Sequence, residues 1–259
     1  FKNINELKIM ILFIKESVQF VFLVLIFSLF TSYSFAVSFE KNCKVPKGSI
    51  KIIKIDGEKY TQFILKDKDK GGCSTDKKSR SGAPYWERTE LAQKNTLSKN
   101  KRHEISFKVK IVEGFKGERE TFFQIHNYNK SAKSVYPSVM LKFDDGFYAS
   151  TSTNPSNLQL DFMYADQKHF HFNKKNIPLA NLKNKWQYFK VILSKIDKNT
   201  ETGYVTIYLN NDIIFNEIKT YFPKKGTPRI KYGIYRPGNL KGNNTSKILY
   251  SKINVNSKK

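Results

Sequence analysis

Apolar side chains recur at every second position along most of this sequence from about residue 50 onward. In an extended strand such residues share one face, so each segment offers an apolar face to a core and a more polar face to its surroundings. The alternation is regular at 105–111, 139–143, 158–162, 189–193 and 205–209. Many short strands without sustained helical periodicity predict an all-β sandwich or barrel.

Turn signals separate the alternating segments. Asp145-Gly146 and the Asn-Asn-Asp stretch at 210–212 lie between such runs, where these residue types favour tight turns. The charged, Gly- and Ser-rich stretch 66–82 is expected to be a loop. No segment has the length and composition of an interdomain linker, so residues 37–259 are predicted to form one domain.

Residues 1–36 have the organisation of a secretory signal peptide. An apolar run at 18–30 follows Lys15, and the small-x-small pattern at 34–36 is typical of a cleavage site. The run is shorter than the ~20 residues of a membrane-spanning helix. We therefore expect a secreted or periplasmic protein without stable membrane insertion after cleavage. The alternative for the same residues is an uncleaved anchor.

Two cysteines follow this segment, Cys43 and Cys73. An even number of cysteines in an exported chain favours a disulfide, which would join the N-terminal segment to the 66–82 loop. The alternative is a pair of free thiols. Neither cysteine has the C-x-x-C spacing of zinc or redox motifs.

The formal net charge of +24 at pH 7 attracts polyanions. Nucleic acid, anionic membrane and acidic polysaccharide are all candidates by charge alone. Export argues against intracellular nucleic acid. Charge and export therefore leave acidic polysaccharide and anionic membrane as candidates. The motifs described below lead us to predict an acidic polysaccharide as the partner, no nucleic acid, and a monomeric protein.

Three segments, 86–91, 122–127 and 229–236, concentrate polar chemistry on one face of a predicted strand. In the first, Arg88 and Glu90 are two positions apart and share a face. Two interpretations stay open for this pair. Either Glu90 orients an arginine that acts on a ligand, or the two residues form a plain structural ion pair.

In the second segment, Gln124 and His126 face one way while Phe123 and Ile125 face the other. A lone strand histidine is often structural, but the shared face with Gln124 favours a functional role. In the third segment, Gly233 removes a side chain and would leave room for a ligand near the backbone. The other outward residues of that segment are Arg229, Lys231 and Tyr235.

These faces together offer the groups that β-elimination from a uronate requires. The C5 proton of a uronate is only weakly acidic while the adjacent carboxylate is charged. An arginine, a glutamine amide and a second cation can bind that carboxylate and stabilise the enolate-like charge that develops. A histidine or tyrosine can take the proton, and a tyrosine can protonate the leaving oxygen. This chemistry requires no metal or organic cofactor.

The same residues resemble the signature strands of the jelly-roll polysaccharide lyases. The motifs are Arg88-Thr89-Glu90-Leu91, Gln124-Ile125-His126 and Lys231-Tyr232-Gly233-Ile234-Tyr235. The alginate-lyase pattern is matched with departures at Ala92 or Gln93, at Arg229 and at Pro237. The heparin lyase I and glucuronan lyase type is closer, because residues 186–189 and 203–210 also resemble its strands. The resemblance covers roughly residues 80–255.

This resemblance implies a concanavalin A-like β-jelly roll in which the three strands line a concave substrate groove. It implies Tyr235 as the catalytic acid, with Tyr235 or His126 as the base. If Tyr235 is the base, His126 would help to neutralise the substrate carboxylate. Arg88 and Gln124 would hold the carboxylate, and Lys231 would bind an adjacent acidic sugar. The further candidates for substrate binding are Arg229, Arg236 and Glu90.

No metal site is predicted. A structural calcium ion could bind Asp67 with Asp69, or Asp144 with Asp145, but no ligand spacing here is diagnostic. Trp186 is expected in the core.

We therefore predict a secreted polysaccharide lyase that cleaves glucuronan, alginate or a heparin-like polymer by β-elimination. The alternative is a non-catalytic binding module for acidic polysaccharide on the same fold. A glycoside hydrolase ranks lower, because its mechanism needs two carboxyls across the scissile bond and the sequence has no Glu-x-Asp-x-x-Glu strand. A basic nucleic-acid-binding protein ranks last.

Overall fold

The computed structural model describes residues 37–78, 83–112, 114, 115, 117, 119–128, 137–144, 157–163, 170–238 and 245–258. The chain divides into two units, and all described residues belong to the second, Phe35–Lys259. The signal peptide at 1–36 and the Asp145-Gly146 turn lie outside the described residues and stay predictions. In the described part, no helix is long and apolar enough to cross a bilayer.

The described elements are mostly β-strands, with two helices of a single turn. The strands are β1 (Phe39–Lys41), β2 (Ile50–Ile55), β3 (Glu58–Leu65), β4 (Trp86–Gln93), β5 (Arg102–Ile111), β6 (Glu120–Tyr128), β7 (Pro137–Asp144), β8 (Asn157–Met163), β9 (Phe170–Pro178), β10 (Trp186–Leu193), β11 (Thr202–Leu209), β12 (Asp212–Tyr221), β13 (Thr227–Pro237), β14 (Ser246–Tyr250) and β15 (Asn254–Lys258). The helices are η1 (Ser74–Lys77) and α2 (Leu179–Leu182).

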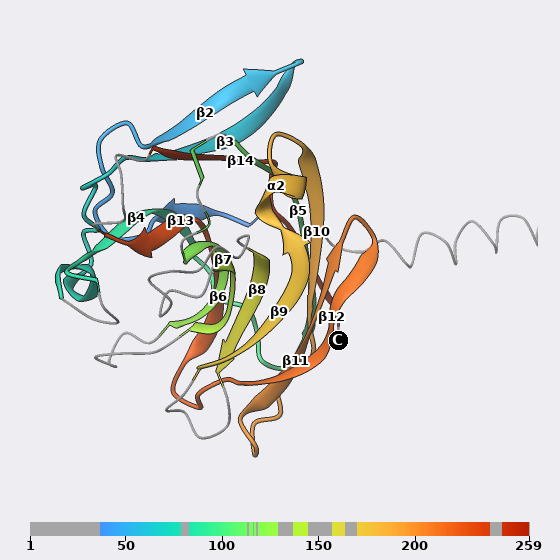
Figure 1. The fold of residues 1–259 in the computed structure, drawn as a ribbon. Helices are drawn as coiled ribbons and strands as arrows, with labels where there is room; N and C mark the ends of the chain where they lie inside the picture. The colour runs from blue at the N-terminus through green and yellow to red at the C-terminus, as the bar shows by residue number, and fades with distance from the viewer. Residues whose placement is uncertain are drawn as a thin grey trace, which may run out of the picture. The chain divides into compact units, whose positions relative to one another are not determined.

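These strands form two antiparallel sheets (Figure 1). The first, which we call the site sheet, has the order β1-β4-β13-β6-β7-β8-β9. The second sheet has the order β12-β11-β10-β5-β14-β3-β2, and β15 also pairs with β5. The alternating segments of the sequence correspond to β5, β7, β8, β10 and β11, so the predicted strands are confirmed.

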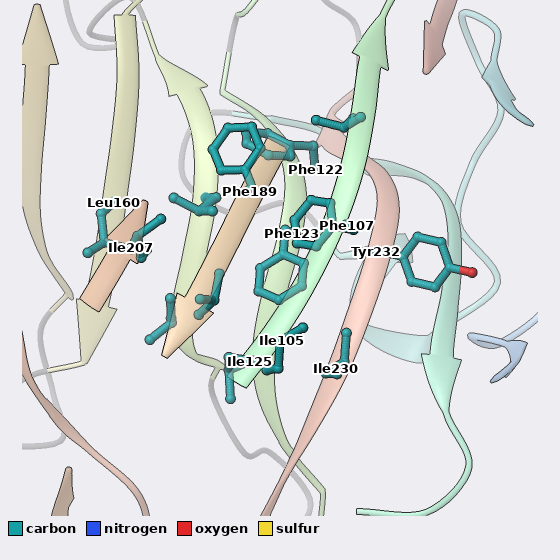
Figure 2. Close-up of a cluster of buried hydrophobic side chains, with 14 of the residues drawn as sticks. Ile105, Phe107, Phe122, Phe123, Ile125, Leu160, Phe189, Ile207, Ile230 and Tyr232 are labelled. Atoms are coloured by element: carbon teal, nitrogen blue, oxygen red, sulfur yellow. The ribbon is translucent and has the colours of Figure 1, made fainter. Parts of the chain in front are cut away.

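The apolar core lies between the two sheets. Phe107 of β5 stacks on Phe123 of β6 with ring centroids 5.0 Å apart, and Figure 2 shows these two rings side by side. Tyr232 of β13 meets Phe63 of β3 edge to face at 5.3 Å. Truncating a core aromatic ring costs about 3–5 kcal/mol, so such contacts hold the sheets face to face. The predicted all-β sandwich is confirmed.

The inward rings determine which residues the site sheet turns outward. Phe123 and Ile125 are fully buried in the core, so Gln124 and His126 lie on the opposite face of β6. On β13 the same alternation turns Lys231 outward between two core residues. The polar face predicted from the sequence is therefore a consequence of core packing.

Two local predictions fall within the described residues. Asn210 and Asn211 connect β11 to β12 with φ of 50° and 77°, the left-handed conformation that asparagine tolerates, so this turn is confirmed. The described part of the 66–82 stretch, residues 66–78, is more ordered than a plain loop. Its residues Ser74–Lys77 form η1, and Asp76 within them is completely buried.

The prediction that Trp186 lies in the core is wrong. Phe189 and Val191 take the inward positions of β10, so Trp186 falls on the outer face of the second sheet. There it is partly exposed and stacks on Tyr60 with centroids 4.6 Å apart.

Gly233 has a different role from the predicted one. Its φ of +136° favours glycine, and a Cβ there would lie 2.3 Å from the Thr89 carbonyl oxygen and 3.0 Å from the Phe63 ring. β13 keeps a regular register with β4 but shifts register against β6 between Tyr232 and Tyr235. The glycine thus accommodates a β-bulge and the close approach of β4, and that approach fills the space predicted for a ligand.

Gly233→Ala should destabilise the protein by more than about 2 kcal/mol, because it combines backbone strain with a clash against β4. Gly57→Ala is the matched control, since its φ is +82° but an added Cβ meets nothing within 4 Å. Urea unfolding of both variants measures the difference. Equal losses of unfolding free energy in the two variants would show that the close approach of β4 does not add to the destabilisation.

Candidate active site

The three polar segments lie on three neighbouring strands, because β13 runs between β4 and β6 in the site sheet. The antiparallel registers then set the predicted residues directly opposite one another. The pairs are Tyr235–Arg88, Lys231–Gln124 and Arg229–His126. The predicted catalytic residues are thus assembled on one face of three paired strands.

Arg88 is buried, and carboxylates hold its guanidinium. Its Nε and Nη2 donate to the two carboxylate oxygens of Asp76 at 2.9 and 2.8 Å, and Nη1 donates to Glu90 at 2.5 Å. The guanidinium carbon lies 4.1 Å from the centroid of the Tyr235 ring. Burial opposes the charge, but Glu90 and Asp76 raise the pKa of Arg88 above its ordinary value. Arg88 is therefore a fixed cation, and the predicted Arg88–Glu90 pair exists as an ion pair.

Glu90 connects Arg88 to Gln124. Its Oε1 accepts the Gln124 amide at 2.6 Å, and its Oε2 accepts the bond from Arg88. Asn42 also donates to this Oε2 at 3.3 Å. Because Glu90 is completely buried, it positions Arg88 and Gln124 and has no surface for the predicted substrate contact.

Asp76 is the residue that sequence reasoning missed. The predicted Cys43–Cys73 disulfide is present, with Cα atoms 5.3 Å apart, and Cys73 immediately precedes η1. The Cys73 N–H donates to Asp76 Oδ2 at 3.2 Å. The disulfide therefore anchors the turn that carries Asp76 to Arg88. The sequence offered one signal for Asp76: it lies three residues after Cys73, which was predicted to form a disulfide.

His126 is a neutral imidazole. Burial and the charge of Lys231 lower the pKa of His126 well below its ordinary value, although the bond to Asn127 opposes the shift. The His126 Nδ1 lies 2.7 Å from the Asn127 carbonyl oxygen, which can only accept a hydrogen bond. Nδ1 therefore carries the proton of the neutral ring, and Nε2 carries the lone pair.

Lys231 is a buried lysine without a carboxylate partner in the described part of the chain. It is 5% exposed, and its Nζ forms no ion pair or hydrogen bond with a described residue. Burial and the nearby charge of Arg88 lower the pKa of Lys231 to about 7, although Glu90 opposes the shift. Arg88 and Lys142, which are also buried, each have a carboxylate partner.

Arg229 and Tyr235 flank Lys231 on the outward row of β13. Tyr235 stacks on Trp86 with centroids 4.8 Å apart and an interplanar angle of 24°. Arg229 lies over the Tyr128 ring at 4.3 Å, and its Nε has no hydrogen-bond partner among the described residues. Arg229 and Lys231 therefore offer hydrogen-bond donors that the described protein does not use.

The prediction that Arg236 binds substrate is wrong. It follows Tyr235 in the strand, so it lies on the inward face and is 1% exposed. Its guanidinium pairs with Glu87 at 2.6 Å and with Glu120 at 3.0 Å. Arg236 therefore stabilises the packing of β13 against β4 and β6 from inside the sandwich.

The polar face continues onto β7 and β8, beyond the predicted residues. Met140 of β7 pairs in register with Gln124 on one side and with Asp161 on the other. Lys142 forms an ion pair with Asp161 at 2.7 Å, and Gln159 donates to Asp161 at 2.6 Å. The alternation in the sequence marked these positions as polar, but their clustering beside Gln124 required the strand order.

The calcium prediction remains open. Among the described residues, no group of three or more His, Cys, Asp or Glu side chains could hold a metal ion. Asp69 accepts a hydrogen bond from the Lys66 N–H at 2.8 Å within a local turn, and Asp145 lies outside the described residues.

Asp76→Ala should destabilise the protein by about 3 kcal/mol, because it removes one of the two carboxylates that compensate the buried charge of Arg88. Asp212→Ala is the control, since Asp212 is exposed and its loss should change the unfolding free energy by less than about 0.5 kcal/mol. Thermal or urea unfolding measures both. A loss no larger than that of the control would show that Asp76 does not hold Arg88.

We compared the sequence and the structure with those of known proteins. A search of curated protein sequences finds no match. Among solved structures, alginate lyase vAL-1 from Chlorella virus is similar with a TM-score of 0.55 at 11% identity, covering 86% of this chain and 93% of its own. Alginate lyase A1-II', a member of polysaccharide lyase family 7, gives 0.53 at 15% identity over 82% and 84%. An endo-β-1,4-glucuronan lyase from the fungus Trichoderma reesei gives 0.51 at 11% identity over 85% and 94%.

At these identities the likeness shows the fold, and the predicted jelly-roll sandwich is confirmed. The family described as polysaccharide lyase matches residues 32–254, which is most of the sequence. The predicted class of enzyme is confirmed by this match, and the chain belongs to the polysaccharide lyase family.

Proposed function

We propose that this lyase cleaves a uronate-containing acidic polysaccharide, namely glucuronan, alginate or a heparin-like polymer, by β-elimination. The observation that carries the proposal is Lys231, a buried lysine with no carboxylate partner in the described residues. A buried charge is costly unless it is paired. The carboxylate of a bound uronate would supply the partner. The names of the similar structures, which include alginate and glucuronan lyases, support the same substrate class.

The residues around Lys231 suit the binding of a carboxylate and of its enolate-like transition state. Gln124 keeps a second amide N–H after its bond to Glu90. Arg229 has an unpaired Nε among the described residues. Arg88 adds a fixed positive charge that Asp76 and Glu90 hold in place. Donors fixed before the reaction stabilise developing charge without reorganisation.

Proton transfer falls to Tyr235 and His126. Neutral His126 has a lone pair on Nε2 and can accept the C5 proton of the uronate. Tyr235 can protonate the O4 leaving group as the C4–O4 bond breaks and the C4–C5 double bond forms. In the alternative assignment, Tyr235 is also the base. Tyr235 is the acid in both assignments.

We propose in addition that the protein is secreted or periplasmic, acts as a monomer and requires no cofactor for the reaction. The Cys43–Cys73 disulfide supports an oxidising compartment. Lys231 and Arg229 supply positive charge at the proposed carboxylate position, which supports a reaction that proceeds without a metal ion. A structural calcium ion elsewhere would be compatible with this chemistry.

In Tyr235→Phe, kcat should fall by about 10²–10⁴-fold, because the proton donor is lost while the ring that stacks on Trp86 is kept. The assay follows the ultraviolet absorbance of unsaturated uronate ends from glucuronan, alginate and heparin in the presence of EDTA. Tyr221→Phe is the control, since the Tyr221 hydroxyl on β12 of the second sheet donates to Glu201 at 2.7 Å and belongs to neither the site sheet nor the catalytic residues. Wild-type protein that binds these polymers without releasing unsaturated ends would be a binding module, and the proposal would fail.

The lowered pKa of Lys231 predicts a pH-dependent KM. With a pKa of about 7, Lys231 is a cation below that pH and neutral above it. KM for an anionic substrate should therefore rise between about pH 6 and about pH 9. The pKa of His126 is well below its ordinary value, so this ring stays neutral and contributes no change over the range.

Lys231→Arg provides the comparison, because a guanidinium remains charged throughout this range. The variant should lose the rise in KM even if its kcat is reduced. A wild-type KM that does not change with pH, or the same inflection in Lys231→Arg, would contradict the assignment of Lys231 to the substrate carboxylate.

A further inference from the structure

The outer face of the second sheet pairs aromatic rings with lysines. On the adjacent strands β5, β10, β11 and β12, four cross-strand pairs each set one aromatic residue opposite one lysine. The pairs are Trp186–Lys110, Tyr188–Lys108, Tyr208–Lys190 and Tyr204–Lys219. We call these residues the aromatic–lysine face. No role in the proposed elimination accounts for it.

This face points away from the core and therefore away from the site sheet. Phe189 and Val191 are buried inward on β10, which leaves Tyr188 and Lys190 outward. Tyr204 is 46% exposed. The sandwich core separates the aromatic–lysine face from the catalytic residues, so a ligand bound there would not contact them.

Most ammonium groups of this face have no partner among the described residues. Lys190 lies 4.2 Å from the centroid of the Tyr208 ring. Lys108, Lys110 and Lys219 form no ion pair and no ring contact with a described residue. Cross-strand pairing of rings with lysine stems stabilises a sheet, but that role does not require the charges to be left unpaired.

The carboxylates of the four strands do not neutralise these lysines. They are Glu104, Asp212 and Glu217. The residues opposite Glu104 are Ile192 and Asn256, and the residue opposite Asp212 is Leu209. The aromatic–lysine face therefore keeps a net positive charge beside flat apolar rings.

We propose that the aromatic–lysine face is a second, non-catalytic binding site for acidic polysaccharide. The Tyr204 ring is exposed, and the rings of Trp186, Tyr188 and Tyr208 are partly exposed. Such rings provide flat apolar surfaces with a polar edge, which suit the apolar faces of sugar rings, and the lysines would bind their carboxylates or sulfates. Four strands about 4.8 Å apart span about 14 Å, which accommodates several linked sugars. The identity of the ligand rests on the proposed function, because one polymer would occupy both sites and gain avidity.

The test measures binding by affinity electrophoresis in gels containing glucuronan, alginate or heparin, with dextran as the neutral polymer. All variants are made in the Tyr235→Phe protein, so that the polymers are not cleaved during the measurement. Lys108→Glu with Lys219→Glu should weaken binding at least about tenfold. Lys51→Glu with Lys54→Glu is the control, because it changes the net charge equally on exposed positions of β2 in the same sheet. Circular dichroism and thermal unfolding verify that each variant is folded.

A second variant tests the aromatic component. Tyr188→Ala should also weaken binding to the charged polymers, and it should leave migration in dextran unchanged. In the catalytically intact protein, both variants should keep kcat/KM on short oligosaccharides within about twofold of wild type and lose activity on the long polymer.

The outcomes separate the two proposals. Charged polymers that bind through the aromatic–lysine face but yield no unsaturated ends would support the second site and refute the proposed function. Cleavage with binding unchanged in both variants, or no binding to any charged polymer, would overturn the second site. Duplex DNA bound equally tightly at the same salt concentration, and lost in the same variants, would replace the polysaccharide with nucleic acid as the ligand.

Discussion

The pairing of the Arg88 guanidinium with two buried carboxylates is the interaction on which the rest of the site depends. Asp76 reaches Arg88 because the Cys43–Cys73 disulfide anchors the turn before it. Glu90 extends the same hydrogen-bond chain to Gln124. Each charged group in this hydrogen-bond network is costly to bury unless all its partners are in place. The network therefore forms together with the fold. The side chains that face substrate are thereby fixed before substrate arrives.

Two sets of basic residues in the described part of the chain lie in different electrostatic environments. Arg88, Arg236 and Lys142 are buried and carry matching carboxylates, so their charges are compensated within the protein. Lys231 on the site sheet lacks such a partner among the described residues, as do the lysines of the aromatic–lysine face. Net charge alone explains only a general affinity for polyanions. The two proposed binding sites lie where lysines have no carboxylate partner among the described residues.

Alternation in the sequence predicted the strands, the core and the face that Gln124 and His126 share, because a period of two depends only on neighbouring residues. The errors concern residues whose role depends on other strands. Arg236 has the inward position that its alternation requires, but the carboxylates that allow an arginine there come from β4 and β6. Gly233 is required by the approach of β4 and by a register shift. Asp76 lay in a segment that local composition marks as a loop.

The sequence by itself determined the all-β class, the family resemblance and the set of polar residues from which the site is made, because strand periodicity and short motifs are local properties. Only the tertiary structure decided which charges are paired. It assigned carboxylates to Arg88 and Arg236 and left Lys231 without one in the described residues. Compensation of a buried charge depends on atoms from distant parts of the chain, and their distances are set when the two sheets pack together.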